Sequence, residues 1–156
     1  MTELEHHGDP RHPKHGDFLR ELGTAVYAAA GVAGIVIDIL RVHHSIDFFK
    51  LVDKDLGGLV STLKLHAETG SPVPELLGYV DDVDRVRAKR NDLIHALPVL
   101  HGLHRRTGKD AGRVVNFYSV EDLQAVTAEF NAVRARGNQL LYFDGGTAVK
   151  AWSKQG

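Results

Sequence analysis

The sequence predicts an all-α protein, an antiparallel four-helix bundle with a short β-hairpin inserted between helices three and four. Two observations favour this fold. Apolar residues recur every three or four positions through four long segments, which is the spacing of one face of an α-helix. A turn-rich and β-prone stretch, residues 99–118, separates the third segment from the fourth. The helical domain is expected over residues 17–144, between a flexible histidine-rich tail, 1–16, and a loose C-terminal tail, 145–156.

The first helix is expected to begin at Asp17, a residue type that caps helix N-termini, and to run to about His43 or beyond. Within it, Leu22–Ile37 carries no charge, but its 16 residues fall short of the roughly 20 that span a bilayer. Small residues such as alanine and glycine are frequent in this stretch, and they allow close helix packing in soluble bundles as well as in membranes. We therefore interpret it as a buried helix of a soluble protein.

The second helix is expected between Asp53 and Thr69, and the third from Pro74 to about Ala96. A Gly-Ser-Pro turn separates the two. Proline is favourable in the first turn of a helix, which suits Pro74, but it cannot continue a helix from within. Pro98 therefore marks the end of the third helix.

The segment after the third helix is expected to form a hairpin in which Val99–Arg105 pairs with Arg113–Tyr118. Ser119 then resembles an N-cap, and Asp122 stands three residues later, close to the pattern of a capping box. The last helix is expected to continue from there to about Phe143, where two glycines follow closely.

Composition narrows the classes of function. The chain has no cysteine, which excludes disulfides, thiolate metal sites and cysteine nucleophiles. Its formal net charge of −1 gives no overall attraction to nucleic acid or to a membrane, so a nucleic-acid footprint would have to be local. The polar N-terminus lacks the apolar core of a secretory signal. A cytoplasmic protein without membrane contact is the expectation.

The most informative feature is the run Arg90-Asn91-Asp92-Leu93-Ile94-His95 near the end of the third helix. Arginine supplies a permanent charge and a fork of donors, and histidine exchanges protons near neutral pH. Together they could handle a phosphate and its protons. The residues alone leave a structural alternative open, in which Arg90 is an ion-pair residue and His95 caps or packs near the helix end, where the helix dipole favours it.

Helix geometry places Arg90 in the middle of an apolar stripe of the third helix. At about 100° per residue, the stripe consists of Tyr79, Val83, Val86, Arg90, Ile94 and Leu97. A charge there must meet a carboxylate, a carbonyl, a subunit boundary or a ligand, because an unpaired buried charge is costly. Arg90 and His95 diverge by about 140° on a straight helix. The length of the arginine side chain, fraying before Pro98, or contributions from two subunits could close that gap.

This run resembles the signature of the HEPN superfamily of helical domains, in which an arginine is followed by Asn, Asp or His and, after four to six intervening residues, by a histidine. The resemblance covers roughly residues 17–143. It implies an antiparallel helical bundle, a homodimer and a composite cleft where two motif helices face each other. It also implies metal-independent RNA cleavage without a cofactor, in which the ribose 2′-OH attacks the adjacent phosphate and leaves a 2′,3′-cyclic phosphate.

The resemblance assigns three catalytic residues. His95 is the general base or acid, Arg90 stabilises charge on the phosphoryl oxygens, and Asn91 positions Arg90, His95 or the ribose. It also suggests a toxin or antiphage effector, with a cognate antitoxin or a neighbouring defence protein as partner. The sequence departs from one branch, whose toxins carry an AMP-accepting tyrosine two residues after the histidine, because Leu97 stands there.

Two other functions remain open. Some HEPN-like domains are inactive, so the chain could be a non-catalytic dimerisation, nucleotide-binding or interaction module. It could also be a structural protein of a larger assembly, in which the first helix packs through its Gly/Ala face.

Positive charge clusters around the motif and favours RNA as a partner. The expected RNA-binding residues are Arg87, Lys89, Arg105, Arg106, Lys109 and Arg113. With Phe117 and Tyr118 they could form a groove for RNA, although a solvated charged face has the same composition.

No metal site is expected, despite ten histidines. Four of these lie in the N-terminal tail, where adventitious binding is the simpler explanation. The pairs His43-His44 and His101/His104 lack nearby carboxylates at ligand spacing, apart from Asp47.

Overall fold

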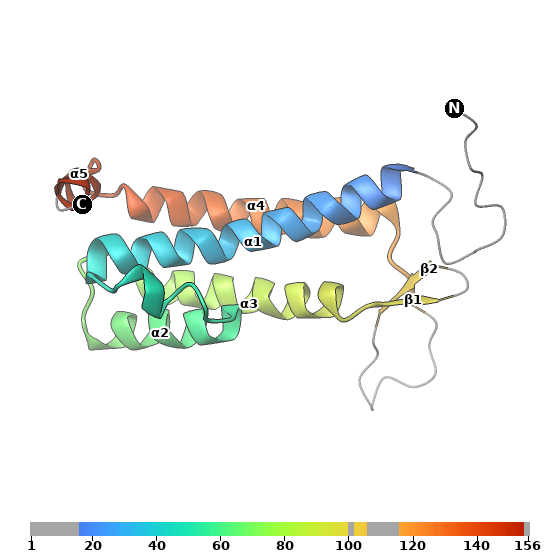
Figure 1. The fold of residues 1–156 in the computed structure, drawn as a ribbon, viewed down its shortest axis with the longest axis horizontal. Coiled ribbons are helices and arrows are strands. Elements are labelled where there is room, and N and C mark those ends of the chain that lie inside the picture. The colour runs from blue at the N-terminus through green and yellow to red at the C-terminus, as the bar shows by residue number, and fades with distance from the viewer. Residues whose placement is uncertain (1–15, 100–101, 106–115, 155–156) are drawn as a thin grey trace.

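The computed structural model describes residues 16–99, 102–105 and 116–154, and most of them are helical (Figure 1). The helices and strands are α1 (Gly16–His44), the 3₁₀ turn η1 (Phe48–Lys50), α2 (Leu56–Thr69), α3 (Leu76–Ile94), β1 (Leu97–Val99), β2 (Gly102–His104), α4 (Val120–Leu141) and α5 (Thr147–Ser153). The prediction of a mainly helical protein with a small hairpin before the last long helix is confirmed.

Three of the four long helices run in the same direction (Figure 1). The end of α1 lies beside the end of α2, where the rings of His44 and His66 are 4.6 Å apart. It also lies beside the end of α4, where Nε2 of His43 is 2.8 Å from the carbonyl oxygen of Leu141. Only α3 runs the opposite way, with Arg87 near its end packed against the start of α2. The expected alternation of directions therefore holds from α2 through α4, and it is wrong for α1, which runs parallel to α2.

The connection between α1 and α2 explains the difference. Residues 45–55 run back along the molecule before α2 begins, so α2 starts far from the end of α1 (Figure 1). Leu51 anchors this crossover because its side chain is fully buried. Asp47 and Asp55 accept hydrogen bonds of 2.7 Å from the backbone N–H groups of Phe49 and Gly58, which starts η1 and α2. Sequence periodicity gives helix lengths but carries no information about such a return path.

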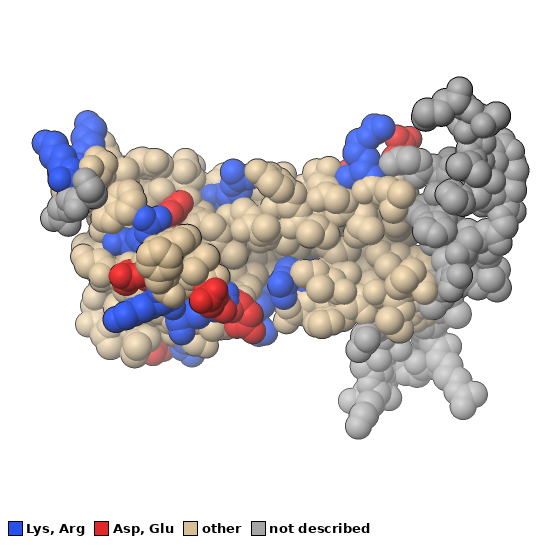
Figure 2. All heavy atoms as spheres, in the orientation of Figure 1, with Lys and Arg blue, Asp and Glu red and all other residues tan. Residues whose placement is uncertain are grey.

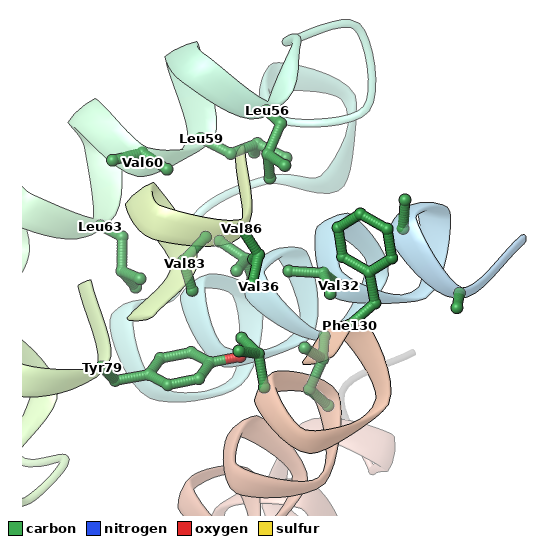
Figure 3. Packing of buried hydrophobic residues seen from close by; sticks show 14 of the residues in the cluster. Val32, Val36, Leu56, Leu59, Val60, Leu63, Tyr79, Val83, Val86 and Phe130 are labelled. Atoms are coloured by element: carbon green, nitrogen blue, oxygen red, sulfur yellow. The ribbon is translucent and has the colours of Figure 1, made fainter. Parts of the chain in front are cut away.

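The core joins all four long helices (Figure 3). Tyr79 of α3 is fully buried, and its ring extends toward the contact between α1 and α4. Gly137 makes this possible: a Cβ added there would meet the Tyr79 hydroxyl and would lie 2.9 Å from Cγ2 of Ile35. Within the described residues the Tyr79 hydroxyl has no hydrogen-bond partner, and burial raises its pKa. The close packing of Tyr79 against Gly137 and Ile35 thus leaves the Tyr79 hydroxyl without a partner among the described residues.

The hairpin differs from the predicted pairing. β1 pairs with β2, so Val99 lies opposite Gly102 instead of the segment 113–118. The predicted partner segment does pair at its end, where His104 and Phe117 form an isolated bridge. The Tyr118 N–H also donates to the Leu103 carbonyl at 3.0 Å. Residues 113–115 lie outside the described part of the chain.

Helix ends follow the sequence closely, except near the C-terminus. Ser119 and Asp122 form the complete capping box at the start of α4. The expectation of a loose tail was wrong for Thr147–Ser153, which forms α5. Asp144 explains this, because its carboxylate accepts hydrogen bonds of 3.0 and 2.8 Å from the N–H groups of Gly146 and Ala148.

By length and composition alone, α1 could cross a membrane. However, 44% of its most apolar window is buried inside the protein, and core helices of soluble proteins meet the same criteria. The length of α1 is therefore weak evidence for a membrane span.

We predict that Gly137→Ala destabilises the fold by about 1–3 kcal/mol, the usual range for overpacking a core, because the added methyl group meets Tyr79 and Ile35. Urea denaturation measures the change. Gly34→Ala is the matched control, since nothing lies within 4 Å of its added Cβ, and it should be neutral or stabilising by up to about 1 kcal/mol. Equal stability of the two variants would contradict the importance of this close approach.

Candidate functional site

Arg90 and Asn91 lie together in the last turns of α3. Nη1 of Arg90 donates a hydrogen bond of 3.1 Å to Oδ1 of Asn91, and both side chains are half-buried. Among the described residues, no carboxylate lies within ion-pair distance of Arg90. In the part of the chain that the structure describes, the hydrogen-bond partner of this guanidinium is a neutral amide oxygen. The bond to Asn91 orients the guanidinium without neutralising its charge.

His95 is placed apart from this pair. It is the C-cap of α3, and its backbone N–H bonds to the carbonyl of Asn91 at 3.0 Å. Its side chain is exposed, and in the described part of the chain no hydrogen bond joins the imidazole to Arg90 or Asn91. The helix thus ends before Pro98, as expected, and among the described residues His95 is not hydrogen-bonded to the other two predicted catalytic residues.

Asp92, inside the motif, has a role that the sequence did not reveal. Its Oδ2 accepts a hydrogen bond of 2.5 Å from the Tyr118 hydroxyl. The guanidinium of Arg105 lies 4.1 Å over the Tyr118 ring, and its Nε is 3.8 Å from the same carboxylate oxygen. Burial and the bond to Asp92 raise the pKa of Tyr118. The cluster fastens the hairpin to α3, and no sequence signal pointed to it because 26 residues separate Tyr118 from Asp92.

The described members of the predicted RNA-binding set are each ion-paired. Arg87 bonds to Asp84 at 2.7 Å, and Lys89 lies 3.2 Å from Glu129 of α4. Arg87 and Lys89 point about 160° apart around α3, so they do not line one groove. Arg105 belongs to the Tyr118 cluster. The remaining members, Arg106, Lys109 and Arg113, lie outside the described residues.

A cavity of about 170 Å³ adjoins the motif on the α4 side of α3. Its charged lining residues are Lys89, Asp92, Arg105, Asp122 and Glu129. Three carboxylates against two cations make this cavity negative overall, so it does not suit a phosphate. An anion would have to approach Arg90 from another side.

Among the described residues, α2 does not reach the part of α3 that carries the motif. With 14 residues, α2 is half as long as the 29-residue α1, and it does not extend along the first half of α1 or the end of α3 (Figure 1). Arg90 follows Val83 by seven residues, and Ile94 follows Arg87 by seven. Since seven residues make nearly two turns, Arg90 and Ile94 continue the side of α3 that faces α2.

The first half of α1 carries exposed apolar residues toward the same opening. Val26 precedes His44 by 18 residues, or five turns, and His44 faces α2, so Val26 lies on that side. Leu19 lies two turns before Val26. We call the surface formed by Leu19, Val26, Arg90 and Ile94 the α1–α3 seam; its three apolar members are exposed. Few charged side chains appear over this region (Figure 2). Exposed apolar surface of this kind marks interaction sites.

A second cluster lies at the opposite end of α1 and contains histidines. Nε2 of His44 is 2.9 Å from Oγ of Ser71, and its ring lies against His66, with His43 next to it. Burial, together with the charges that His66 and His43 would carry, lowers the pKa of His44 to about 4. Within the described ranges, no group of three His, Cys, Asp or Glu side chains is arranged to hold a metal ion.

No protein-family model, curated protein or solved structure matches this chain. The resemblance to the HEPN superfamily therefore rests on the motif and its helical setting.

We predict that Tyr118→Phe lowers the free energy of unfolding by about 1–3 kcal/mol, because it removes a hydrogen bond to a carboxylate. Urea denaturation measures the loss. Tyr142→Phe is the control, since Tyr142 is exposed and should be nearly neutral. If both variants were as stable as the wild type, the hairpin would not be fastened through Asp92.

We also predict that acid destabilises the protein through His44. Its pKa is lower in the folded state than the ordinary 6.5, so its stabilising contribution is complete above pH 6.5 and declines as the pH falls toward 4. The slope of stability against pH in this window should be smaller in His44→Gln. Identical slopes in urea titrations of the two proteins would refute a role for His44.

Proposed function

We propose that this protein is a metal-independent endoribonuclease of HEPN type that acts as a homodimer in the cytoplasm. The observation that carries the proposal is Arg90: it is half-buried, bonded to Asn91, and without a carboxylate partner among the described residues. It stands on the α1–α3 seam, and an exposed histidine, His95, follows five residues later.

The environment of Arg90 favours an anionic ligand. A guanidinium withdrawn partly from water is stable only if a charge or several acceptors compensate the lost hydration. Asn91 supplies one acceptor and fixes the orientation of the fork. The phosphodiester group offers the remaining charge and accepts two parallel N–H bonds from arginine.

Within this proposal, the four long helices correspond to the HEPN bundle, and the return of residues 45–55 between α1 and α2 is a departure from it. A second copy that covers the α1–α3 seam would remove Leu19, Val26 and Ile94 from water. It would also place two Arg90–Asn91 pairs beside two His95 residues. Arg90 from one copy could then act on the same phosphate as His95 from the other copy. The two residues would not need to lie on the same side of one α3 helix.

The proposed reaction uses His95 for proton transfer and Arg90 for charge. The imidazole of one His95 removes the proton from the ribose 2′-OH as the 2′ oxygen bonds to phosphorus. The bond from phosphorus to the 5′ oxygen breaks, and the protonated His95 of the second copy gives its proton to that oxygen. Arg90 stabilises the charge on the non-bridging oxygens. The products are a 2′,3′-cyclic phosphate and a 5′-OH end.

A second candidate function follows from the position of His95. Because no hydrogen bond joins it to Arg90 or Asn91 in the described residues, the chain could be a non-catalytic dimerisation, nucleotide-binding or interaction module. The seam would then hold a second copy or a regulatory protein, such as an antitoxin or a neighbouring defence protein, and Arg90 would bind an acidic group.

We predict that the purified protein cleaves a mixed RNA pool in the presence of EDTA, and that His95→Ala and Arg90→Ala each reduce cleavage at least 100-fold. General acid–base catalysis alone is typically worth 10²–10⁴-fold. Gel analysis and end mapping should find cyclic-phosphate ends, and DNA should resist because it lacks the 2′-OH.

Lys64→Ala is the control, since it removes an exposed cation of α2 and should cleave like the wild type. Equal cleavage by wild type and His95→Ala would point to another site or a contaminant. No cleavage by a folded, dimeric wild type would favour the interaction module.

A further inference from the structure

A hollow of about 560 Å³ lies along the contact between α1 and α4, and no residue of α2 or α3 lines it. Gly31, Gly34, Ile35 and Asp38 form its α1 side. A Cβ added at Gly34 meets nothing within 4 Å, so this part of the hollow is open. At Gly31, the side chain of Arg134 lies over the helix, 3.1–3.3 Å from where a Cβ would be. Small and apolar residues thus line part of the hollow, and the guanidinium group of Arg134 lines another part.

Tyr27 protrudes from the same edge of α1. Its side chain is 74% exposed, which is unusual for an aromatic residue in the middle of a long helix. Tyr27 precedes Gly34 by seven residues, so the two positions share one side of α1 and lie about 10 Å apart along it. One edge thus carries both a projecting ring and an empty hollow.

We propose that this edge binds a second copy of the chain, with Tyr27 of each copy inserted into the hollow of the other. The two α1 helices would pair antiparallel about a two-fold axis between residues 30 and 31. Such an isologous contact requires a self-complementary surface, and a ring and a hollow at equal distances from the axis provide one. The ring would stack on the Arg134 guanidinium. Its hydroxyl would reach the polar side chains of Asp38 or Asn131.

Charge complementarity supports this pairing. No charged residue lies between Glu21 and Asp38 on α1, so the two α1 helices themselves bring no like charges together near the axis. Arg20 is about ten residues from the axis and Asp38 about seven, so in the pair they differ by only about 4–5 Å along the helices. An arginine side chain spans that distance. By symmetry, the pair gains this contact twice.

Within the described residues, the two side chains involved make only weak ion pairs. Arg20 pairs with Asp17 at 3.4 Å, and both side chains are mostly exposed, an arrangement worth little in water. Asp38 is half-exposed and lies 3.6 Å from Arg41, and burial raises its pKa. A second cation would stabilise the Asp38 carboxylate.

The contact is separate from the α1–α3 seam. Val26 of the seam and Tyr27 of this edge point about 100° apart around α1, and α2 and α3 lie together on one side of the α1–α4 pair (Figure 1). The inference thus does not rest on the proposed ribonuclease. If both contacts form, the assembly exceeds a dimer.

The area buried between the two copies limits how stable the proposed pair can be. A stable interface buries about 1,200–2,000 Å² in total, and two tyrosines supply about 300–500 Å² of it. The rest must come from the small residues of α1 and the facing side of α4. We therefore expect association that depends on concentration.

The test fills the hollow or removes the ring. Gly34→Leu places a side chain where the partner ring would enter, in open space and with a better helix former, so the monomer stays folded. Tyr27→Ala removes the ring. Sedimentation equilibrium at micromolar concentrations should give at least twice the mass for the wild type as for either variant. Phe49→Ala, which removes a ring that is 78% exposed elsewhere, should match the wild type.

A charge swap makes the test specific. Asp38→Arg should weaken association, and adding Arg20→Asp should restore it. Equal masses for wild type, Gly34→Leu and Tyr27→Ala would overturn the proposal. Binding of the wild type to phosphatidylcholine vesicles, lost in Tyr27→Ala without a change in mass, would also overturn it and assign the edge to a membrane. RNA cleavage by the Gly34→Leu variant, measured in parallel, separates this contact from the proposed ribonuclease.

Discussion

The close approach of α1 and α4 is the constraint on which the rest of the structure depends. It exists because Gly137 leaves room for the ring of Tyr79 and for Ile35, so that α3 inserts an aromatic side chain where three helices meet. The arrangement leaves one buried hydroxyl without a partner, a cost of about 1–3 kcal/mol that dispersion and apolar burial offset. The α1–α4 hollow lies along this contact, lined by residues of α1, α4 and the turn after α4.

The shortness of α2 decides where the molecule can bind something. The return of residues 45–55 makes α2 begin halfway along α1, and Leu51 and the caps at Asp47 and Asp55 hold that path in place. Within the described ranges, α2 therefore does not cover the end of α3 as it covers the rest of that helix. Arg90 lies at this opening, which explains how a charge in an apolar stripe is tolerated: the stripe leaves the core before it reaches Arg90.

The residues of the motif have three different structural roles. Arg90 and Asn91 form a bonded pair at the opening, Asp92 turns to the opposite side and holds Tyr118, and His95 caps the helix in solvent. The hairpin cluster and the proposed phosphate chemistry thus use neighbouring residues without competing for them. This division favours a site completed by a second copy, because one chain presents the charge and the proton carrier on different sides of α3.

The sequence by itself determined the local features: the four long helices, the capping box of Ser119 and Asp122, the end of α3 before Pro98, and the unusual position of Arg90. These depend on neighbours within one or two helical turns, which periodicity and capping chemistry record. Only the tertiary structure decided the direction of α2, the bond from Tyr118 to Asp92, and the hollow that faces Tyr27. Each of these joins residues that are distant in sequence, and such pairings follow from how the chain returns on itself and packs, for which a single sequence holds no local signal.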